Sequence, residues 1–215
     1  MVSDLQPDLF GPSSTGTHGL QRHDLGDGAI VDYVQDFILP SAAEVYFRRL
    51  LDEINWKQDH IRLYGKLVKL PRLTAWYGDK GSSYNYSGIG MDPNPWTDLL
   101  QELRSAVEAT SDARFNSVLL NLYRDGRDGV AWHRDNEPEL GPEPVIGSLS
   151  FGQARPFQFR HKFKKEAPRF QLILSAGSLV IMRGTTQQYW EHQIPKTQRN
   201  VESRINLTFR YISGE

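Results

Sequence analysis

The sequence predicts an α+β protein in which an N-terminal portion with helices covers a core made of strands. From residue 115 onward, short apolar runs alternate with turns rich in Gly, Pro and Asp, which is typical of a sandwich, jelly roll or barrel. Before that point, two longer segments carry apolar residues at helical spacing. The 215 residues, 39% of them apolar, are enough for one sizeable core.

The chain is expected to form one domain after an irregular N-terminal arm. Residues 1–28 are rich in Gly, Ser, Asp and Pro and lack periodicity, so we interpret them as the arm. The single domain then covers residues 29–215. It divides into an N-terminal extension over 29–114 and an all-β core over 115–215.

The N-terminal extension contains two predicted helices and several strands. Pro40 and Ser41 begin the first helix, with Ser41 as N-cap, and its apolar face is expected to hold Val45, Leu50, Leu51 and Ile54. The second helix covers 95–109, with helical spacing of Leu99, Leu100, Leu103 and Val107. Residues 30–37 predict a short strand, and residues 61–77 predict strands or a hairpin.

The predicted core strands cover residues 116–124, 130–134, 145–151, 156–161, 170–174, 178–182, 190–194 and 203–212. The last of them alternates without interruption. Its polar side chains are Arg204, Asn206, Thr208 and Arg210, and its apolar ones are Ile205, Leu207, Phe209 and Tyr211. Because successive side chains of a strand point to opposite faces, we expect the apolar face to pack in the core and the polar face to line a cavity.

A histidine and a carboxylate, His133 and Asp135, are two residues apart in a predicted strand and can therefore reach one ion together. His192 would complete the set from another strand. Two imidazoles and one carboxylate form the facial triad of non-haem Fe(II) oxygenases, which leaves positions open for a chelating co-substrate and O₂. A His-x-Asp pair alone is a weak signal, and a lone histidine is more often structural. The remaining histidines, which we interpret as surface residues, are His18, His23, His60 and His161.

The arginines of the last strand indicate a dicarboxylate co-substrate, because a guanidinium binds a carboxylate through two parallel hydrogen bonds. Arg204 and Arg210 are separated by roughly 20 Å of strand, so they converge on one small diacid only by leaning inward. Asn121 and Tyr123, which also share a face, add an amide and a phenol to such a pocket. The alternative is an ordinary amphipathic strand with exposed arginines.

Composition excludes several classes of site and partner. The chain has no cysteine, which excludes disulfides, thiolate zinc sites and a cysteine nucleophile. It shows no apolar run of membrane-spanning length and no signal-peptide pattern, so we expect a cytoplasmic protein, or a nuclear one if the source is eukaryotic, without a membrane partner. The net charge of −1 neither indicates nor excludes nucleic acid.

Two basic stretches flank an acidic run over residues 135–143. The first consists of Lys57, His60, Arg62, Lys66, Lys69 and Arg72, and the second of Arg155, Arg160, His161, Lys162, Lys164, Lys165 and Arg169. Each stretch is either a solvated face or an edge that contacts phosphates beside a site.

Several motifs over residues 61–212 occur in the order found in a known enzyme family. They are N-L-Y-R-D-G at 121–126, W-H-R-D-N-E-P-E-L-G-P at 132–142, S-L-S-F-G at 148–152, F-R-H-K at 159–162 and R-I-N-L-T-F-R at 204–210. This pattern resembles the AlkB family of Fe(II)/2-oxoglutarate dioxygenases. The motifs P-R-L-T-A-W-Y-G at 71–78 and Y-N-Y-S-G at 84–88 resemble its members that demethylate nucleic acids.

The resemblance implies a double-stranded β-helix, or jelly-roll, core with flanking N-terminal helices and a nucleotide-recognition lid within the extension. It implies that Fe(II) is held by His133, Asp135 and His192. It further implies a 2-oxoglutarate pocket made of Asn121, Tyr123, Arg204, Asn206, Thr208 and Arg210, with Arg204 as the main partner of the distal carboxylate. The implied reaction is oxidative demethylation of bases such as 1-methyladenine and 3-methylcytosine in DNA, or also in RNA, with release of formaldehyde, succinate and CO₂.

Chemistry on a base requires that the base be flipped into a pocket, where aromatic side chains can stack on it. The resemblance assigns the substrate side to Tyr64, Arg72, Tyr84, Tyr86, Ser87, Asn136, Glu137 and Arg160. Tyr84 and Tyr86 would stack on the base, although a Tyr- and Ser-rich surface loop is the simpler interpretation without the resemblance. Tyr64 takes the place where some relatives insert an apolar wedge, so a tyrosine there is a departure.

Two further functions remain open at this point. A 2-oxoglutarate-dependent hydroxylase of a protein or small molecule would keep the triad and Arg204 but have no use for Tyr84, Tyr86 or the basic stretches. A non-catalytic module of the same fold is the other, and the presence of all three metal-binding side chains argues against it. We expect a monomer.

Overall fold

The computed structural model describes residues 19–213 except 64, 82–83, 87–88 and 92. Its larger sheet has seven antiparallel strands in the order β1 (Leu20–Gly26), β2 (Ala29–Val34), β13 (Leu179–Gly184), β10 (Ile146–Gly152), β15 (Arg204–Arg210), β8 (Ser117–Tyr123) and β5 (Leu73–Gly78). Strands far apart in the chain are therefore neighbours, as in β2–β13 and β10–β15.

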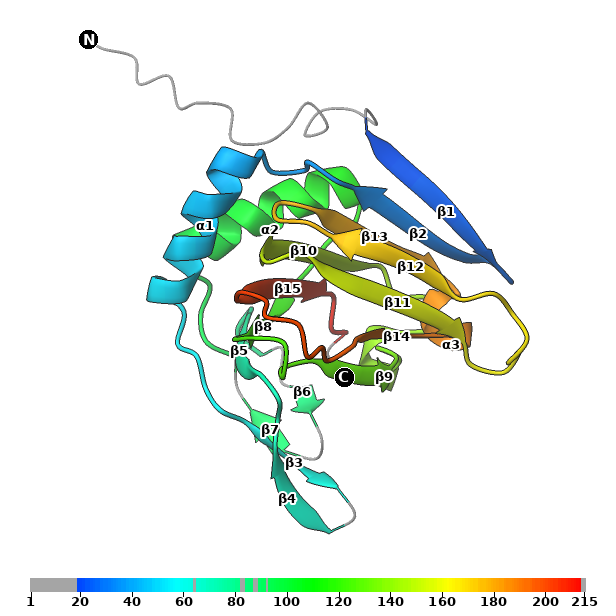
Figure 1. The fold of residues 1–215 in the computed structure, drawn as a ribbon. Coiled ribbons are helices and arrows are strands. Elements are labelled where there is room, and N and C mark those ends of the chain that lie inside the picture. The colour runs from blue at the N-terminus through cyan, green and yellow to red at the C-terminus, as the bar shows by residue number, and fades with distance from the viewer. Residues whose placement is uncertain (1–18, 64, 82–83, 87–88, 92, 214–215) are drawn as a thin grey trace.

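A smaller sheet packs against the inner face of the larger one (Figure 1). Its strands are β12 (Phe170–Leu174), β11 (Arg155–His161), β14 (Trp190–Ile194) and β9 (Val130–His133). Two separate hairpins, β3 (His60–Leu63) with β4 (Lys66–Lys69) and β6 (Tyr84–Tyr86) with β7 (Ile89–Met91), lie beyond the β5 edge of the larger sheet (Figure 1). All the predicted core strands, and the hairpin within 61–77, are confirmed.

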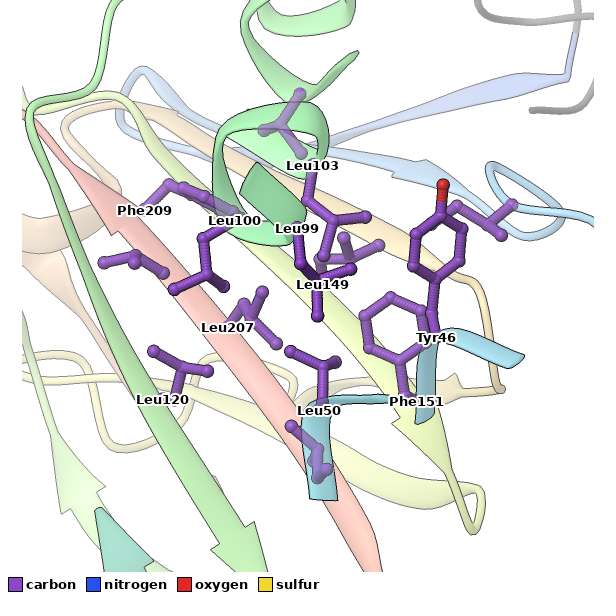
Figure 2. Close-up of a cluster of buried hydrophobic side chains, with 14 of the residues drawn as sticks. Tyr46, Leu50, Leu99, Leu100, Leu103, Leu120, Leu149, Phe151, Leu207 and Phe209 are labelled. Atoms are coloured by element: carbon purple, nitrogen blue, oxygen red, sulfur yellow. The ribbon is translucent and has the colours of Figure 1, made fainter. Parts of the chain in front are cut away.

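Helices α1 (Pro40–Glu53) and α2 (Asp98–Ser111) cover the outer face of the larger sheet, and two short helices, η2 (Pro138–Leu140) and α3 (Thr186–Tyr189), lie in the connections of the core (Figure 1). Figure 2 shows the cluster of buried side chains beneath α1 and α2. Its labelled members are Tyr46, Leu50, Leu99, Leu100, Leu103, Leu120, Leu149, Phe151, Leu207 and Phe209. In the described part of the chain, no helix is long and apolar enough to cross a membrane.

Strand β15 shows how the alternating sequence positions the site. Ile205, Leu207 and Phe209 are fully buried on the helix-covered face. Arg204, Asn206 and Thr208 point the other way and line a cavity on the inner face of the sheet. The predicted division of this strand into an apolar face and a cavity face is therefore confirmed. Tyr211 is the exception, because it lies beyond the end of β15 and is 55% exposed.

The prediction of an irregular arm over residues 1–28 is wrong for residues 20–26, which form β1 at the edge of the larger sheet. Asp27 and Gly28 join β1 to β2, and both have positive φ angles, of 54° and 81°. An Asp-Gly pair with this geometry makes the tight turn that suits the twist of a hairpin. That dipeptide was the signal in the sequence for a strand on each side of it.

The predicted N-cap and part of the predicted apolar face of the first helix are also wrong. Helix α1 begins at Pro40, so Leu39 occupies the cap position and Ser41 lies inside the first turn. Proline suits the first helical position because its missing N–H would have no helical partner there. The buried face is made of Ala42, Ala43, Tyr46 and Leu50, whereas Val45 is 58% exposed.

Candidate metal centre and co-substrate pocket

His133, Asp135 and His192 come together at the β9 edge of the smaller sheet. The two histidines are direct cross-strand partners on β9 and β14, and their ring centroids are 4.3 Å apart. Asp135 follows two residues after His133, on the same side of the chain. One potential ligand atom from each of the three side chains lies within 4.8 Å of the other two. These residues, which the sequence singled out, therefore form a group that could hold one metal ion.

The hydrogen bonds of His133 set which of its nitrogens can bind a metal. Its Nδ1 lies 2.9 Å from the carbonyl oxygen of Ala131 and donates to it. The lone pair then stands on Nε2, which lies 3.9 Å from Oδ1 of Asp135. His192 is buried, and burial together with the neighbouring His133 lowers its pKa to about 3. A neutral imidazole is the form that binds a divalent cation.

Asp135 supplies the negative charge of the group. Its Oδ2 accepts hydrogen bonds from Nη2 and Nε of Arg210 at 2.9 and 3.3 Å. Burial alone would raise the pKa of Asp135, but Arg210 and the two histidines outweigh it and hold that pKa well below the ordinary 3.8. The site therefore offers one ionised carboxylate and two imidazoles, which is a donor set suited to Fe(II).

The three residues lie in the wall of a cavity of about 830 Å³. All six residues expected to bind 2-oxoglutarate line the same cavity: Asn121, Tyr123, Arg204, Asn206, Thr208 and Arg210. The two arginines lie at opposite ends of β15, as their spacing requires. Arg210 contacts the metal-binding carboxylate, and Arg204 pairs across the sheet with Tyr123. Both arginine side chains nevertheless line the same cavity.

Arg204 is a buried cation with hydrogen-bonding capacity left over. Its side chain is 1% exposed, and its Nη2 donates to Oγ of Ser150 at 2.9 Å. Its Nε and Nη1 are buried without a partner among the described residues. Burial lowers its pKa to about 10, which still leaves it charged at neutral pH. Because a buried charge without a counter-charge is costly, this guanidinium fits a site for a carboxylate ligand.

The neighbouring polar side chains are held in place by one another. Asn206 donates from Nδ2 to Ser148 Oγ at 2.8 Å and to the carbonyl of Leu149 at 3.1 Å, and its Oδ1 accepts from Thr208 Oγ1 at 3.1 Å. Asn121 Oδ1 accepts from Nε of Arg72 at 2.6 Å. Arg72 is 6% exposed and lines the cavity, so it belongs to the pocket wall and not to an exposed basic edge.

Of the remaining residues expected to bind substrate, some line the cavity and others lie outside its lining or outside the described residues. Glu137 lines the cavity, and its Oε2 is buried without a partner among the described residues. Asn136 is exposed. Arg160 lies outside the cavity lining and forms an ion pair of 2.7 Å with Glu191, with its guanidinium 4.4 Å from the ring centroid of Trp132. Tyr84 and Tyr86 share one face of the β6 backbone, and Tyr64 and Ser87 lie outside the described residues.

The second basic stretch is less uniform than its sequence indicates. Arg155 is 1% exposed and donates to main-chain carbonyls, including that of Pro195 at 2.7 Å. His161 is buried beside Asp27, so the prediction of a surface histidine is wrong there. Lys164 forms an ion pair of 2.7 Å with the same Asp27. These contacts fasten the loop after β11 to the β1–β2 turn.

Two residues that contact site residues were given no role from the sequence. Gln187 accepts a hydrogen bond from the backbone N–H of Asp135, and Ser150 accepts one from Arg204. Both reach the site from elements distant in the chain. Gln187 has no distinguishing spacing in the sequence. Ser150 lies in the S-L-S-F-G motif at 148–152, two residues after Ser148 on the same strand, but the motif alone does not assign it a partner.

Residues 31–210 match the profile of the 2OG-Fe(II) oxygenase superfamily. The human alpha-ketoglutarate-dependent dioxygenase alkB homolog 3 is 41% identical over 184 residues, which cover 82% of this chain and 64% of that protein. The mouse DNA oxidative demethylase ALKBH2 is 38% identical over 200 residues, which cover 89% of this chain and 83% of that protein. The chain belongs to the AlkB family.

This AlkB-family chain is shorter than some of its relatives, since its match spans 62% of the alkB homolog 3 of Rattus norvegicus. The solved structure of OsALKBH1 superposes with a TM-score of 0.60 at 14% identity, covering 89% of this chain and all of that one. The expected jelly-roll fold is thereby confirmed. Fe(II) and 2-oxoglutarate are the cofactor and co-substrate of the AlkB family, and the donor set and the buried Arg204 fit both.

Proposed function

We propose that this chain is an oxidative demethylase of N-alkylated bases, such as 1-methyladenine and 3-methylcytosine, in DNA or also in RNA. The observation that carries the proposal is a single cavity, on the polar face of β15, that is lined by two functional groups at its two poles, meaning its two ends. One pole is the group of His133, Asp135 and His192, and the other is the under-partnered guanidinium of Arg204. The likeness to the mouse DNA oxidative demethylase ALKBH2 supports the choice of substrate.

Within this proposal, His133, Asp135 and His192 hold Fe(II) and leave positions open for 2-oxoglutarate and O₂. When bound, Fe(II) would supply, with O₂ and 2-oxoglutarate, the oxidising power to hydroxylate the N-methyl carbon. One oxygen atom of O₂ would go to that carbon and the other to succinate, as 2-oxoglutarate loses CO₂. The hydroxymethyl product then releases formaldehyde and the unmodified base. Arg210 keeps the Asp135 carboxylate ionised and oriented through two hydrogen bonds.

Arg204 binds the distal carboxylate of 2-oxoglutarate in a charge-assisted pair. Ser150 holds the guanidinium at Nη2, which leaves Nε and Nη1 without a partner among the described residues. The centroid of the Tyr123 ring lies 5.2 Å from Cζ of Arg204. Asn121, Asn206, Thr208 and Arg210 line the path between the two poles. Because their amides and hydroxyl are already held by neighbours, they present fixed groups to the co-substrate.

The substrate base enters from the side of the hairpins, which we propose form the nucleotide-recognition lid of the 29–114 extension above the 115–215 core. Tyr84 and Tyr86 on β6 stack on the flipped base, at about 1–3 kcal/mol per base. Tyr64, Ser87, Asn136 and Arg160 border the entrance. Lys69 lines the cavity mouth from β4 and is exposed, which suits a contact to a phosphate.

Glu137 is the residue that favours methylated bases of this kind. Methylation of adenine at N1 or cytosine at N3 gives the base a positive charge. Glu137 lines the cavity, and its Oε2 has no partner among the residues that the structure describes. A carboxylate at short range stabilises a cation over a neutral base. The enzyme acts on nucleic acid as a monomer, in the nucleus or the cytoplasm.

The test is anaerobic reconstitution with Fe(II), followed by addition of 2-oxoglutarate, O₂ and an oligonucleotide that contains one 3-methylcytosine. Mass spectrometry should then show the oligonucleotide lighter by one CH₂ group. The His133→Ala variant should leave it unchanged, since that variant lacks one of three metal-binding side chains.

The other outcome identifies the alternative function. Succinate that forms with the wild-type protein, disappears with His133→Ala and is never accompanied by a change in any alkylated oligonucleotide would refute the demethylase. It would leave a 2-oxoglutarate-dependent hydroxylase of a protein or small molecule.

A further inference from the structure

The backbone of Asp135 is held by a side chain from another part of the fold. Strand β9 ends at His133, so the ladder of the smaller sheet does not extend to Asp135. The Asp135 N–H instead donates to Oε1 of Gln187 at 3.0 Å, and both residues are buried. This is a single, specific hydrogen bond to the main chain of a candidate metal-binding residue.

We propose that Gln187 is a positioning residue of the metal centre, which fixes the Asp135 carboxylate where it meets the two histidines. This inference rests on the proposed metal-binding role of His133, Asp135 and His192. Arg210 donates to Oδ2 of the Asp135 carboxylate, whereas the bond to Gln187 is made by the Asp135 backbone. Gln187 thus controls the position of the Cα atom, and Arg210 controls the rotation of the carboxylate.

The Gln187 side chain has only one orientation that satisfies its surroundings. Its Nε2 donates to Sδ of Met182 at 3.3 Å, and its side chain is 1% exposed. The Asp135 N–H is a donor and needs an oxygen opposite it, so the amide oxygen must face Asp135 and the amide nitrogen must face the sulfur. An oriented, buried amide can hold its partner more firmly than an exposed one whose geometry competes with water.

Helix α3, which carries Gln187, is itself anchored to the larger sheet. Thr186 Oγ1 donates to the carbonyl of Arg183 at 2.6 Å and accepts from the N–H of Ile30 at 3.2 Å. Gln187 therefore connects Asp135 to β2 and β13, which lie in the other sheet. The position of the Asp135 carboxylate therefore depends on the larger sheet as well as on its own loop.

A second contact joins α3 to the segment that contains Asp135, through carbonyls of α3 instead of a side chain. The guanidinium of Arg134, next to Asp135, donates from Nη1 to the carbonyls of Gln188 and Gln187 at 2.7 and 3.4 Å. These carbonyls stand at the end of a one-turn helix, where helical partners are missing. Helix α3 continues directly into β14, which carries His192 (Figure 1). One turn of chain therefore sets the spacing between two of the three metal-binding residues.

Partners behind the metal ligands commonly change metal affinity by about 10- to 100-fold when they are removed. The Gln187→Met variant keeps the length and apolar volume of the side chain and removes the acceptor. We expect it to bind Mn(II) about 10- to 100-fold more weakly than the wild type, as followed by the electron paramagnetic resonance signal of free Mn(II). The visible spectrum of the Co(II)-loaded variant should shift as well, because the ligand geometry changes.

The matched control is Gln188→Met in the same turn. Gln188 donates from Nε2 to the carbonyl of Pro142 at 2.7 Å and does not contact Asp135 through its side chain. We expect its Mn(II) affinity to stay within about twofold of the wild type. If the turn had a purely structural role, the two variants would lose thermal stability to the same extent. Neither variant would then show a shifted Co(II) spectrum.

The Gln187→Glu variant retains an oxygen opposite the Asp135 N–H, so its Co(II) spectrum should resemble that of the wild type. If the Gln187→Met protein does not fold, the Gln187→Glu variant alone tests the inference. A Co(II) spectrum of Gln187→Glu that is shifted from that of the wild type would then contradict the acceptor role. Unchanged Mn(II) affinity and an unchanged Co(II) spectrum in a folded Gln187→Met protein would overturn the inference. Absence of Mn(II) binding to the wild type would instead overturn the proposed metal site itself.

Discussion

At the scale of single residues, buried arginines differ in how many hydrogen bonds the protein itself makes to them. Arg155 and Arg204 are equally buried, at 1% exposure. Arg155 donates to the carbonyls of Asp125, Asp128 and Pro195 and leaves only its Nε without a partner in the described part of the chain. Arg204 donates only to Ser150 there and leaves both Nε and Nη1 without a partner. The first arginine therefore contributes to stability, and the second contributes to co-substrate binding.

Replacement of these two arginines by methionine should have opposite effects. Arg204→Met removes a cost of burial, so its free energy of unfolding without 2-oxoglutarate should equal or exceed that of the wild type. Its affinity for 2-oxoglutarate should fall by about 2–5 kcal/mol, because the carboxylate would be buried without its counter-charge. Calorimetric titration of the Mn(II)-loaded protein measures this loss.

Arg155→Met is the control, and it should lower the free energy of unfolding by about 1–3 kcal/mol, because it leaves buried carbonyls without donors. Binding of 2-oxoglutarate to Arg204→Met with nearly wild-type affinity would show that the distal carboxylate binds elsewhere.

A second residue-scale prediction concerns Glu137. Neutralisation in Glu137→Gln should reduce the preference for a 3-methylcytosine oligonucleotide over the unmethylated one by about tenfold, which corresponds to about 1.4 kcal/mol. Competitive binding to the Mn(II)-loaded protein, without O₂, measures the preference. Glu139→Gln is matched in charge but does not line the cavity, and it should leave the preference unchanged. Equal selectivity of Glu137→Gln and the wild type would remove Glu137 from substrate recognition.

The residues of the site that could be predicted from the sequence are those that share a strand. His133 with Asp135, and Arg204 with Asn206, Thr208 and Arg210, follow from alternation and spacing. Gln187 and Ser150 could not be predicted in this way, because their roles depend on hydrogen bonds between elements far apart in the chain.

At the scale of elements, the spacing of apolar residues was enough to predict a helix or strand wherever that spacing was regular. Helix α2 buries the four residues whose spacing predicted it, and it begins after Thr97, whose Oγ1 accepts from the N–H of Leu100 at 3.3 Å. The N-cap of helix α1 lies two positions before the predicted Ser41, at Leu39, because Pro40 occupies the first helical position. Strand β1 was missed because its polar composition conceals the alternation, although the Asp27–Gly28 turn marks its end.

The two helix starts give a direct comparison. Thr97→Ala should lower the free energy of unfolding by about 1 kcal/mol, because it removes a side-chain cap from α2. Ser41→Ala should change it by no more than about 0.5 kcal/mol, since Ser41 lies inside α1 and makes no capping bond there. Urea denaturation measures both. A larger effect at Ser41 than at Thr97 would mean that the boundaries of these helices are wrong.

At the scale of the whole molecule, a buried carboxylate connects three strands of the larger sheet. Asp32 on β2 is fully buried and accepts from Arg22 on β1 at 2.7 Å and from Arg183 on β13 at 3.0 Å. Burial alone would raise the pKa of Asp32, but the two arginines outweigh it and lower that pKa below the ordinary 3.8. The carboxylate is therefore ionised in the folded protein.

This arrangement predicts a specific acid sensitivity. Because the folded pKa of Asp32 is lowered, its contribution to stability is fully present above its unfolded pKa of about 3.9 and is lost as the pH falls through the folded pKa. Asp32→Asn should cost about 3 kcal/mol at neutral pH, and this difference from the wild type should shrink as the pH falls below about 4. Urea unfolding in the presence of a chelator, at several pH values, measures the difference. A difference that does not depend on pH would exclude the ion pairs as its source.

We propose that the cavity couples the breakdown of 2-oxoglutarate at His133, Asp135 and His192 to the removal of a methyl group from a base. The most direct test counts, in one reaction, the succinate formed and the methyl groups lost from a 3-methylcytosine oligonucleotide. We predict equal amounts with the wild-type protein and neither product with Asp135→Ala. Succinate formed at the same rate with and without the oligonucleotide, and no demethylated product, would contradict this coupling.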